Sequence, residues 1–143
     1  MTEDRPANAE TLAISGCEKE LCRLRELFAG LSWSIDTVHT LAEAKEWLTR
    51  NRTPVILCES CLPDGDWKAA LRLTAGSANS PSLIVMSRLA DERLWVDVLS
   101  SGGYDVMALP VTRADLFHTL SGAWRSWKAR HNTDAVPLCA ALN

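Results

Sequence analysis

The chain has 143 residues, 47% of them hydrophobic and 23% charged, which is typical of one globular domain that can bury its own core. Its formal net charge of −3, with no basic block in the sequence, excludes tight electrostatic binding to nucleic acid. Its longest hydrophobic runs, about six residues, are far shorter than the roughly 20 needed to span a bilayer, so we expect no membrane insertion.

The first half of the chain alternates between strand and helix patterns. Leucines recur at helical spacing through 18–31, and Thr40 with Glu43 has the sequence of a capping box at the start of a second helix. Asp66 is placed to cap a third helix, which Gly76 ends. We therefore predict strands over 11–15, 33–38 and 54–58, and helices over 18–31, 40–51 and 67–75.

The second half repeats this alternation. We predict strands over 82–86 and 104–108, and helices over 91–101 and 112–130. Five strands alternating with five helices predict an α/β fold, a three-layer (βα)5 flavodoxin-like sandwich with a five-stranded parallel sheet in the order 2-1-3-4-5. The predicted organisation is a disordered segment over 1–10, one domain over 11–130, and a tail or linker over 131–143.

Glu59 occupies the most informative position of the sequence. It follows the buried strand pattern of 54–58 and precedes a Leu-Pro-Asp-Gly turn over 62–65. Ser87 likewise follows the next buried strand pattern along the chain. Because the carboxyl ends of parallel strands meet at one edge, where open α/β sheets bind their ligands, we expect both side chains in a candidate site.

With two further features, this pattern resembles the receiver domains of bacterial response regulators over 11–130. The features are a Ser-Gly-Gly-Tyr-Asp sequence at 101–105 and Pro110 after the fifth predicted strand. The resemblance implies that the position of Glu59 carries, in the family, an Asp that takes a phosphoryl group from a histidine kinase. It also implies an acidic pair that holds Mg²⁺ after the first strand, and a Lys that neutralises the phosphoryl oxygens.

The sequence departs from this family pattern at most of the functional positions. Leu109, before Pro110, replaces the Lys, and Val106 replaces the aromatic switch residue, whereas Ser87 keeps the switch hydroxyl. The former acidic-pocket positions are Ser15, Gly16, Cys17 and Glu18. Because Mg²⁺ needs carboxylate ligands and phosphoryl transfer needs charge neutralisation, we expect weak or absent Mg²⁺ binding, no cofactor and no enzymatic activity.

These departures favour a degenerate receiver, or pseudo-receiver, that serves two-component (phosphorelay) signalling through protein–protein contact without phosphorylation. Glu59 then has two interpretations. It is either a solvated carboxylate in a retired pocket, or a fixed imitation of the phosphorylated state that a hydrogen bond from Ser87 supports. An atypical receiver that is phosphorylated on Glu59 itself is the alternative.

The cysteines suggest a function of another class. Cys58 and Cys61 form a CxxC motif, and we expect Cys17 at the same sheet edge, so a small redox-responsive protein would use these three thiols. Zinc would need two more ligands than this motif supplies. An odd number of cysteines in a domain with its own core is more typical of reduced structural thiols, and the N-terminus lacks the apolar core of a signal peptide. We therefore expect a cytoplasmic protein.

Six tryptophans exceed what one small core needs, and aromatic side chains are enriched at interfaces. Receiver domains often meet partners through the surface of their fourth helix, fifth strand and fifth helix. The candidate interface residues on this surface are Trp95, Tyr104, Trp124 and Trp127, with core packing as the alternative for most tryptophans. The resemblance implies a protein partner here: a histidine kinase, an output domain, or a second copy in a homodimer.

Overall fold

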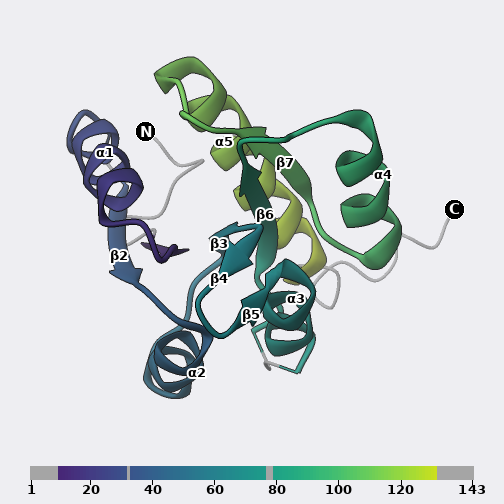
Figure 1. Ribbon diagram of the computed structural model, residues 1–143. Coiled ribbons are helices and arrows are strands. Elements are labelled where there is room, and N and C mark those ends of the chain that lie inside the picture. Colours follow the sequence, from purple (N-terminus) through teal and green to yellow (C-terminus); the bar gives the residue numbers. More distant parts are fainter. Residues whose placement is uncertain (1–9, 32, 77–78, 132–143) are drawn as a thin grey trace, which may run out of the picture.

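The computed structural model describes residues 10–31, 33–76 and 79–131, which form a parallel sheet between two layers of helices (Figure 1). The strands of the sheet are β1 (Glu10–Ile14), β2 (Ser34–Val38), β3 (Val55–Glu59), β6 (Ser82–Ser87) and β7 (Asp105–Ala108). They are arranged in the order β2-β1-β3-β6-β7. Counted by themselves along the chain, the strands have the order 2-1-3-4-5, so the predicted flavodoxin-like fold is confirmed.

Helices cover both faces of the sheet (Figure 1). One face carries α1 (Glu18–Ala29) and α5 (Arg113–His131), and the other carries α2 (Leu41–Arg50), α3 (Trp67–Ala75) and α4 (Glu92–Ser101). Alternate residues of β3 point to opposite faces, so Leu57 joins the hydrophobic cluster under α1 and α5, whereas Ile56 joins the cluster under the other helices. Of the helices in the described part of the chain, none has the length and apolar character to cross a membrane.

Side chains at the helix starts agree with most of the predicted caps. The Asp66 carboxylate accepts two backbone N–H groups in the first turn of α3, as predicted. At α2, the Thr40 hydroxyl accepts the Glu43 N–H at 3.1 Å. The Glu43 carboxylate, however, accepts the N–H of His39 at 2.7 Å rather than that of Thr40. The second half of the predicted capping box is therefore wrong by one residue.

Several predicted element ends shift in the structure. Helix α1 ends at Ala29 rather than at Leu31, because the Gly30 N–H already closes the last turn on preceding carbonyls. Strands β3 and β6 each extend by one residue beyond the prediction. Glu59 and Ser87 are thus the last residues of their strands, which fixes where both side chains emerge at the sheet edge.

The predicted terminal segments fall almost entirely outside the described residues. Glu10 belongs to β1 and His131 belongs to α5. Residues 1–9 and 132–143 are not among those described. The predicted disorder of the first segment and the predicted tail therefore stay predictions.

A short antiparallel hairpin directly follows Glu59, and the sequence did not predict it. Its strands are β4 (Cys61–Leu62) and β5 (Gly65–Asp66), which are too short to show alternation. Asp64 in the turn accepts the N–H groups of Leu41 at 2.8 Å and Ala42 at 3.1 Å, at the start of α2. A Cβ on Gly65 would lie 2.5 Å from Leu41 Cδ1. Glycine at this position lets the hairpin pack directly on α2.

Candidate functional site

The carboxyl ends of β1, β3, β6 and β7 form one edge of the sheet, and the predicted site residues lie along it. Hydrogen bonds continue the strand pairing past the strand ends. The Ser60 N–H donates to the Met86 carbonyl at 2.8 Å, and the Leu109 N–H donates to the Ser87 carbonyl at 3.0 Å. Glu59 ends the strand between β1 and β6, so it occupies the middle of this edge.

The half-buried Glu59 side chain takes its hydrogen bond from Ser15. The Ser15 hydroxyl donates to Glu59 Oε1, with 2.5 Å between the two oxygens. The same hydroxyl oxygen accepts the Cys17 N–H at 3.0 Å, so a buried Ser15 connects the β1–α1 loop to the end of β3. The interpretation of Glu59 as an imitation of the phosphorylated state requires a hydrogen bond from Ser87, and none is formed between these two residues in the structure. The Ser87 hydroxyl oxygen accepts the Leu89 N–H at 3.1 Å.

The loop after β1 packs against the hairpin after β3. A Cβ on Gly16 would lie 3.0 Å from both Cγ and Cδ of Pro63, so the two loops touch at a residue without a side chain. The sequence predicted Ser15 and Gly16 as former acidic-pocket positions. The first presents a hydroxyl and the second a backbone surface, and neither presents a carboxylate to a cation.

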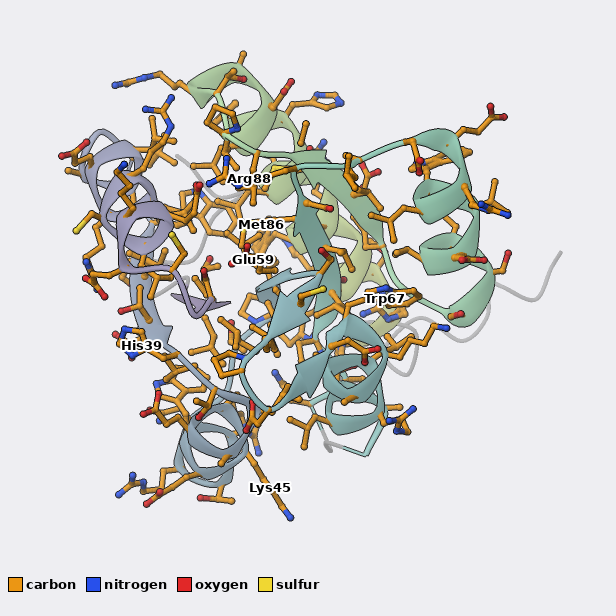
Figure 2. The ribbon with its side chains drawn as sticks, viewed as in Figure 1. His39, Lys45, Glu59, Trp67, Met86 and Arg88 are labelled. Carbon is orange, nitrogen blue, oxygen red and sulfur yellow. The ribbon has the colours of Figure 1, made fainter. Side chains whose placement is uncertain are left out.

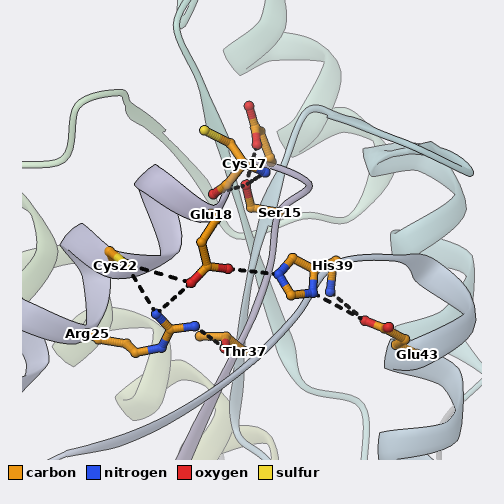
Figure 3. A network of polar contacts seen from close by, with 9 residues as sticks. Ser15, Cys17, Glu18, Cys22, Arg25, Thr37, His39 and Glu43 are labelled. Carbon is orange, nitrogen blue, oxygen red and sulfur yellow. Dashed lines mark hydrogen bonds and ion pairs between the residues drawn. The ribbon is translucent and has the colours of Figure 1, made fainter.

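Glu18, the remaining acidic candidate of this loop, points away from Glu59. Figure 3 shows its carboxylate between His39 and Arg25. Glu18 Oε1 lies 2.9 Å from His39 Nε2, and Glu18 Oε2 lies 3.1 Å from Arg25 Nη1. The hydrogen bond with His39, followed by that with Arg25, lowers the pKa of Glu18. Its assignment to the former acidic pocket is therefore wrong, because its charge serves a surface network that joins α1 to the end of β2.

An ion pair beside the site was missed by the sequence analysis. Arg88 directly follows Ser87 and pairs with Glu20 of α1. Figure 2 labels Arg88 together with Met86 and Glu59. Glu20 is 7% exposed, whereas the Arg88 side chain remains largely in solvent. The pair ties the β6–α4 loop to α1, and an acidic residue at a helical position is too common a sequence signal to have identified it.

Leu109 and Pro110 complete the edge beyond β7. The Leu109 side chain is buried in the cluster under α1 and α5, and the Leu109–Pro110 peptide bond is cis. An apolar group thus occupies the position that the resemblance to receiver domains assigns to a Lys. Within residues 10–31, 33–76 and 79–131, no group of three or more His, Cys, Asp or Glu is arranged to hold a metal ion. The residues present do not fit Mg²⁺, and the expected weak binding stays a prediction.

The cysteines of the redox alternative differ in accessibility. Cys58 is buried, and burial, followed by the charges of Glu59 and Asp66, raises its pKa to about 12. Cys61 is exposed and Cys17 is half-buried, and the four cysteines of the described residues are free thiols. Because the thiolate is the reactive form, the structure weighs against redox chemistry at Cys58.

The predicted interface residues separate into exposed and buried ones. Trp95 on α4 is 46% exposed, and its indole N–H donates to Asp105 at 3.2 Å. Trp124 is 5% exposed and packs edge-on against Trp33, with 6.2 Å between ring centroids. Its assignment to the interface is wrong, because it lies on the stripe of α5 that faces the sheet.

Trp127 and Tyr104 are half-buried. The Trp127 indole N–H donates to the Asn79 carbonyl at 2.9 Å. The Tyr104 hydroxyl would lie 2.5 Å from a Cβ on Gly122, so this ring packs directly on α5. Tyr104 precedes β7 and therefore lies at the end of that strand opposite Ser87 and Leu109. Val106 packs under α4 and provides no aromatic ring at the predicted switch position. Tyr104 lies too far along the strand to take over that position.

No family model matches the chain. Among curated proteins, 84 residues, 59% of the chain, are 32% identical to "Probable transcriptional regulatory protein y4xI" of Sinorhizobium fredii, and the match covers 37% of that protein. The chain thus spans little more than a third of the length of this relative.

Solved receiver domains resemble the chain over nearly all of their length. The signal receiver domain of an HD domain-containing protein from Pseudomonas fluorescens Pf-5 has a TM-score of 0.80 at 18% identity, covering 92% of this chain and 97% of that one. A two-component response regulator from Clostridium difficile gives 0.74 at 22%, covering 82% and 97%. The beryllofluoride-activated NtrC4 receiver domain dimer gives 0.74 at 21%, covering 82% and 98%. The chain therefore has the fold of response-regulator receiver domains.

Proposed function

We propose that this chain is a pseudo-receiver of two-component signalling, which acts through protein–protein contact and is neither phosphorylated on Glu59 nor an enzyme. The contact between Ser15 and Glu59 is the observation that carries this proposal. A hydroxyl stands where the family has a metal-binding carboxylate, and it already donates to the carboxylate that would have to act as nucleophile.

The charges at the sheet edge support the same proposal. Phosphoryl transfer depends on cations that neutralise the developing charge, and each such group typically contributes several kcal/mol. Leu109 supplies no charge, and the Arg88 guanidinium is engaged by Glu20. Since about 1.4 kcal/mol corresponds to a factor of ten in rate, losing a metal ion and a Lys together would slow the reaction by several orders of magnitude.

The exposed hydrophobic side chains of the described residues supply a surface for the proposed partner. They are Leu89, Trp95, Val96, Leu99 and Phe117, from α4, the loop before it, and α5. Trp95, Val96 and Leu99 lie within one turn of α4, so their exposed side chains adjoin one another, and adjoining exposed apolar side chains mark interaction sites. We propose that a histidine kinase, an output domain or a second copy binds here, in the cytoplasm and without direct contact with nucleic acid or membrane. The regulatory name of the curated relative supports a role in gene control through such a partner.

The phosphorylation part of the proposal is tested by incubating the protein with Mg²⁺ and acetyl phosphate and measuring its intact mass. We expect no phosphoryl adduct on the wild type. A Glu59→Gln variant is the matched control, because an adduct that persists in it resides on another residue. An adduct that forms on the wild type and disappears in Glu59→Gln would establish the atypical phosphorylated receiver instead.

The interface part is tested by multi-angle light scattering and by binding of a purified cognate kinase or output domain. Val96→Lys with Leu99→Lys should weaken association. The matched control, Ala29→Lys with Thr49→Lys, adds the same charge at exposed positions of α1 and α2 and should leave association unchanged. Equal loss in both variants would contradict the assignment of this surface.

A further inference from the structure

Helices α2 and α3 leave an apolar groove between them, on the sheet face opposite α1 and α5. Its volume is about 420 Å³. We call it the α2–α3 groove, and its apolar lining consists of Leu41, Ala42, Ala69 and Leu73. Three of these side chains, all but Ala42, belong to or pack on the hydrophobic cluster of this face, so the groove is an opening onto the core.

Two cations stand at the rim of this groove. Lys45 extends from α2 on the side of α3 (Figure 2), and Arg72 of α3 lines the groove as well. Both residues are exposed. None of the ion pairs formed among the described residues includes either of them, in contrast to Arg25, Arg50 and Arg88.

Asp64 also lines the groove, but its charge is already engaged. Its carboxylate accepts the N–H groups of Leu41 and Ala42 at the start of α2, where the helix dipole is positive. The groove therefore presents a positive rim around an apolar floor, although the whole chain carries a formal net charge of −3.

We infer that the α2–α3 groove binds a short acidic amphipathic segment of a partner protein. Its apolar side chains would cover Ala42, Ala69 and Leu73, and its carboxylates would pair with Lys45 and Arg72. An amphipathic helix laid into an apolar groove is a recurrent mode of peptide recognition. This surface is separate from the exposed side chains of α4, and the inference does not depend on the function proposed for them.

The charge of the rim selects this occupant over others. A neutral apolar segment would take water from two cations without giving them a partner, which is unfavourable. A basic segment would be repelled, because like charges facing each other across an interface oppose binding. An amphipathic segment with carboxylates covers the apolar floor and also pairs with the cations of the rim.

The probe is a fluorescein-labelled synthetic peptide in which leucines recur at helical spacing with glutamates between them, and binding is followed by fluorescence anisotropy. A matched peptide with every Glu changed to Gln tests the charge, and one with every Leu changed to Ser tests the floor. We expect the acidic amphipathic peptide to bind more tightly than either, with an affinity that falls as salt is added.

Charge reversal of the rim locates the binding. Lys45→Glu with Arg72→Glu should weaken binding about tenfold or more, which is about 1.4 kcal/mol. The control, Lys19→Glu with Arg93→Glu on exposed positions of α1 and α4, changes the net charge equally and should leave affinity within about twofold. Circular dichroism and thermal unfolding establish that the wild type and both double variants are folded.

Amide chemical shifts of the wild type give an independent map that needs no variant. The largest changes on adding the peptide should fall on the groove lining, Leu41, Ala42, Ala69 and Leu73. The inference is overturned if no peptide binds, if both charge-reversed variants lose affinity equally, or if the shift changes gather on α4. Self-association that Lys45→Glu with Arg72→Glu abolishes would also overturn it, since a second copy would then be the occupant.

Discussion

The Ser15 hydroxyl and the Glu59 carboxylate join the ends of β1 and β3 directly, with 2.5 Å between their oxygens. A hydrogen bond to a charged acceptor contributes roughly 1.5–3 kcal/mol. Ser15→Ala should therefore lower the free energy of unfolding by about 1–3 kcal/mol, because it leaves Glu59 without its donor. Urea denaturation followed by tryptophan fluorescence measures the change. In a Glu59→Gln background the same substitution should cost clearly less, and an equal cost would show that this contact contributes little.

The hydrogen bonds between the Asp64 carboxylate and the start of α2 should weaken in acid. The hydrogen bond from the Leu41 N–H, supported by that from Ala42, lowers the pKa of Asp64. A carboxyl whose pKa is depressed by folding stabilises the fold above its unfolded pKa, about 3.9, and this contribution is lost as pH falls through the folded value. Asp64→Asn should thus be less stable than wild type at neutral pH, and the difference should vanish in acid. A difference that persists at low pH would contradict this expectation.

The Glu18 network predicts a measurable titration. Since the contact with His39 is the largest cause of the lowered pKa of Glu18, His39→Gln should move that pKa up toward its ordinary value. Carbon-detected NMR of the Glu18 carboxyl group follows this directly. Lys19→Gln, at an exposed neighbouring position, is the control and should leave the pKa of Glu18 unchanged. An unchanged Glu18 titration in His39→Gln would mean that the contact is not formed in solution.

The cysteines should differ in reactivity toward iodoacetamide. Cys58 is buried with a pKa of about 12, so it should remain unmodified in the native protein at neutral pH. Cys22 and Cys61 are exposed and should react. Peptide mapping by mass spectrometry, before and after unfolding, distinguishes them. Rapid labelling of native Cys58 would reopen the redox alternative.

Replacing Gly102 should cost stability through its backbone conformation, not through a steric clash of the new side chain. Its φ is +108°, and no atom lies within 4 Å of a Cβ built there, so substitution changes conformation alone. Gly102→Ala should destabilise the protein by about 1 kcal/mol. Gly76→Ala is the matched control, because Gly76 ends α3 with φ −84° and should tolerate alanine within about 0.5 kcal/mol. Thermal and urea unfolding of both variants decide the point.

The fold was predictable because its signals are local and repeated. The continuous apolar run ending at Glu59 predicted a central strand, and Asp66 and Gly76 predicted both ends of α3. The hairpin after Glu59 was not predictable, since two-residue strands have no pattern of their own. It contacts α2 through Asp64 and the β1–α1 loop through Pro63, and both of these segments lie far away in the sequence.

The sequence predicted where the candidate site lies in the fold, but not which of its residues contact one another. Strand ends located Glu59, Ser87 and Leu109 on one edge, as found. The donor to Glu59 was not identified, because Ser15 and Ser87 both follow buried strands and the sequence does not show which of the two hydroxyls lies next to the carboxylate. Trp124 was misplaced for a related reason. A Trp on an amphipathic helix has the same spacing whether it faces the sheet or its rim.

The hairpin after Glu59 touches the molecule on two sides, through Pro63 on the β1–α1 loop and through Asp64 on α2. Displacing it would therefore disturb two distant segments at once. If two ligands each shift the hairpin, one bound on α2 and one bound beside residue 59, thermodynamic linkage requires that each change the affinity of the other by the same factor. Such coupling would let one bound protein influence the binding of another.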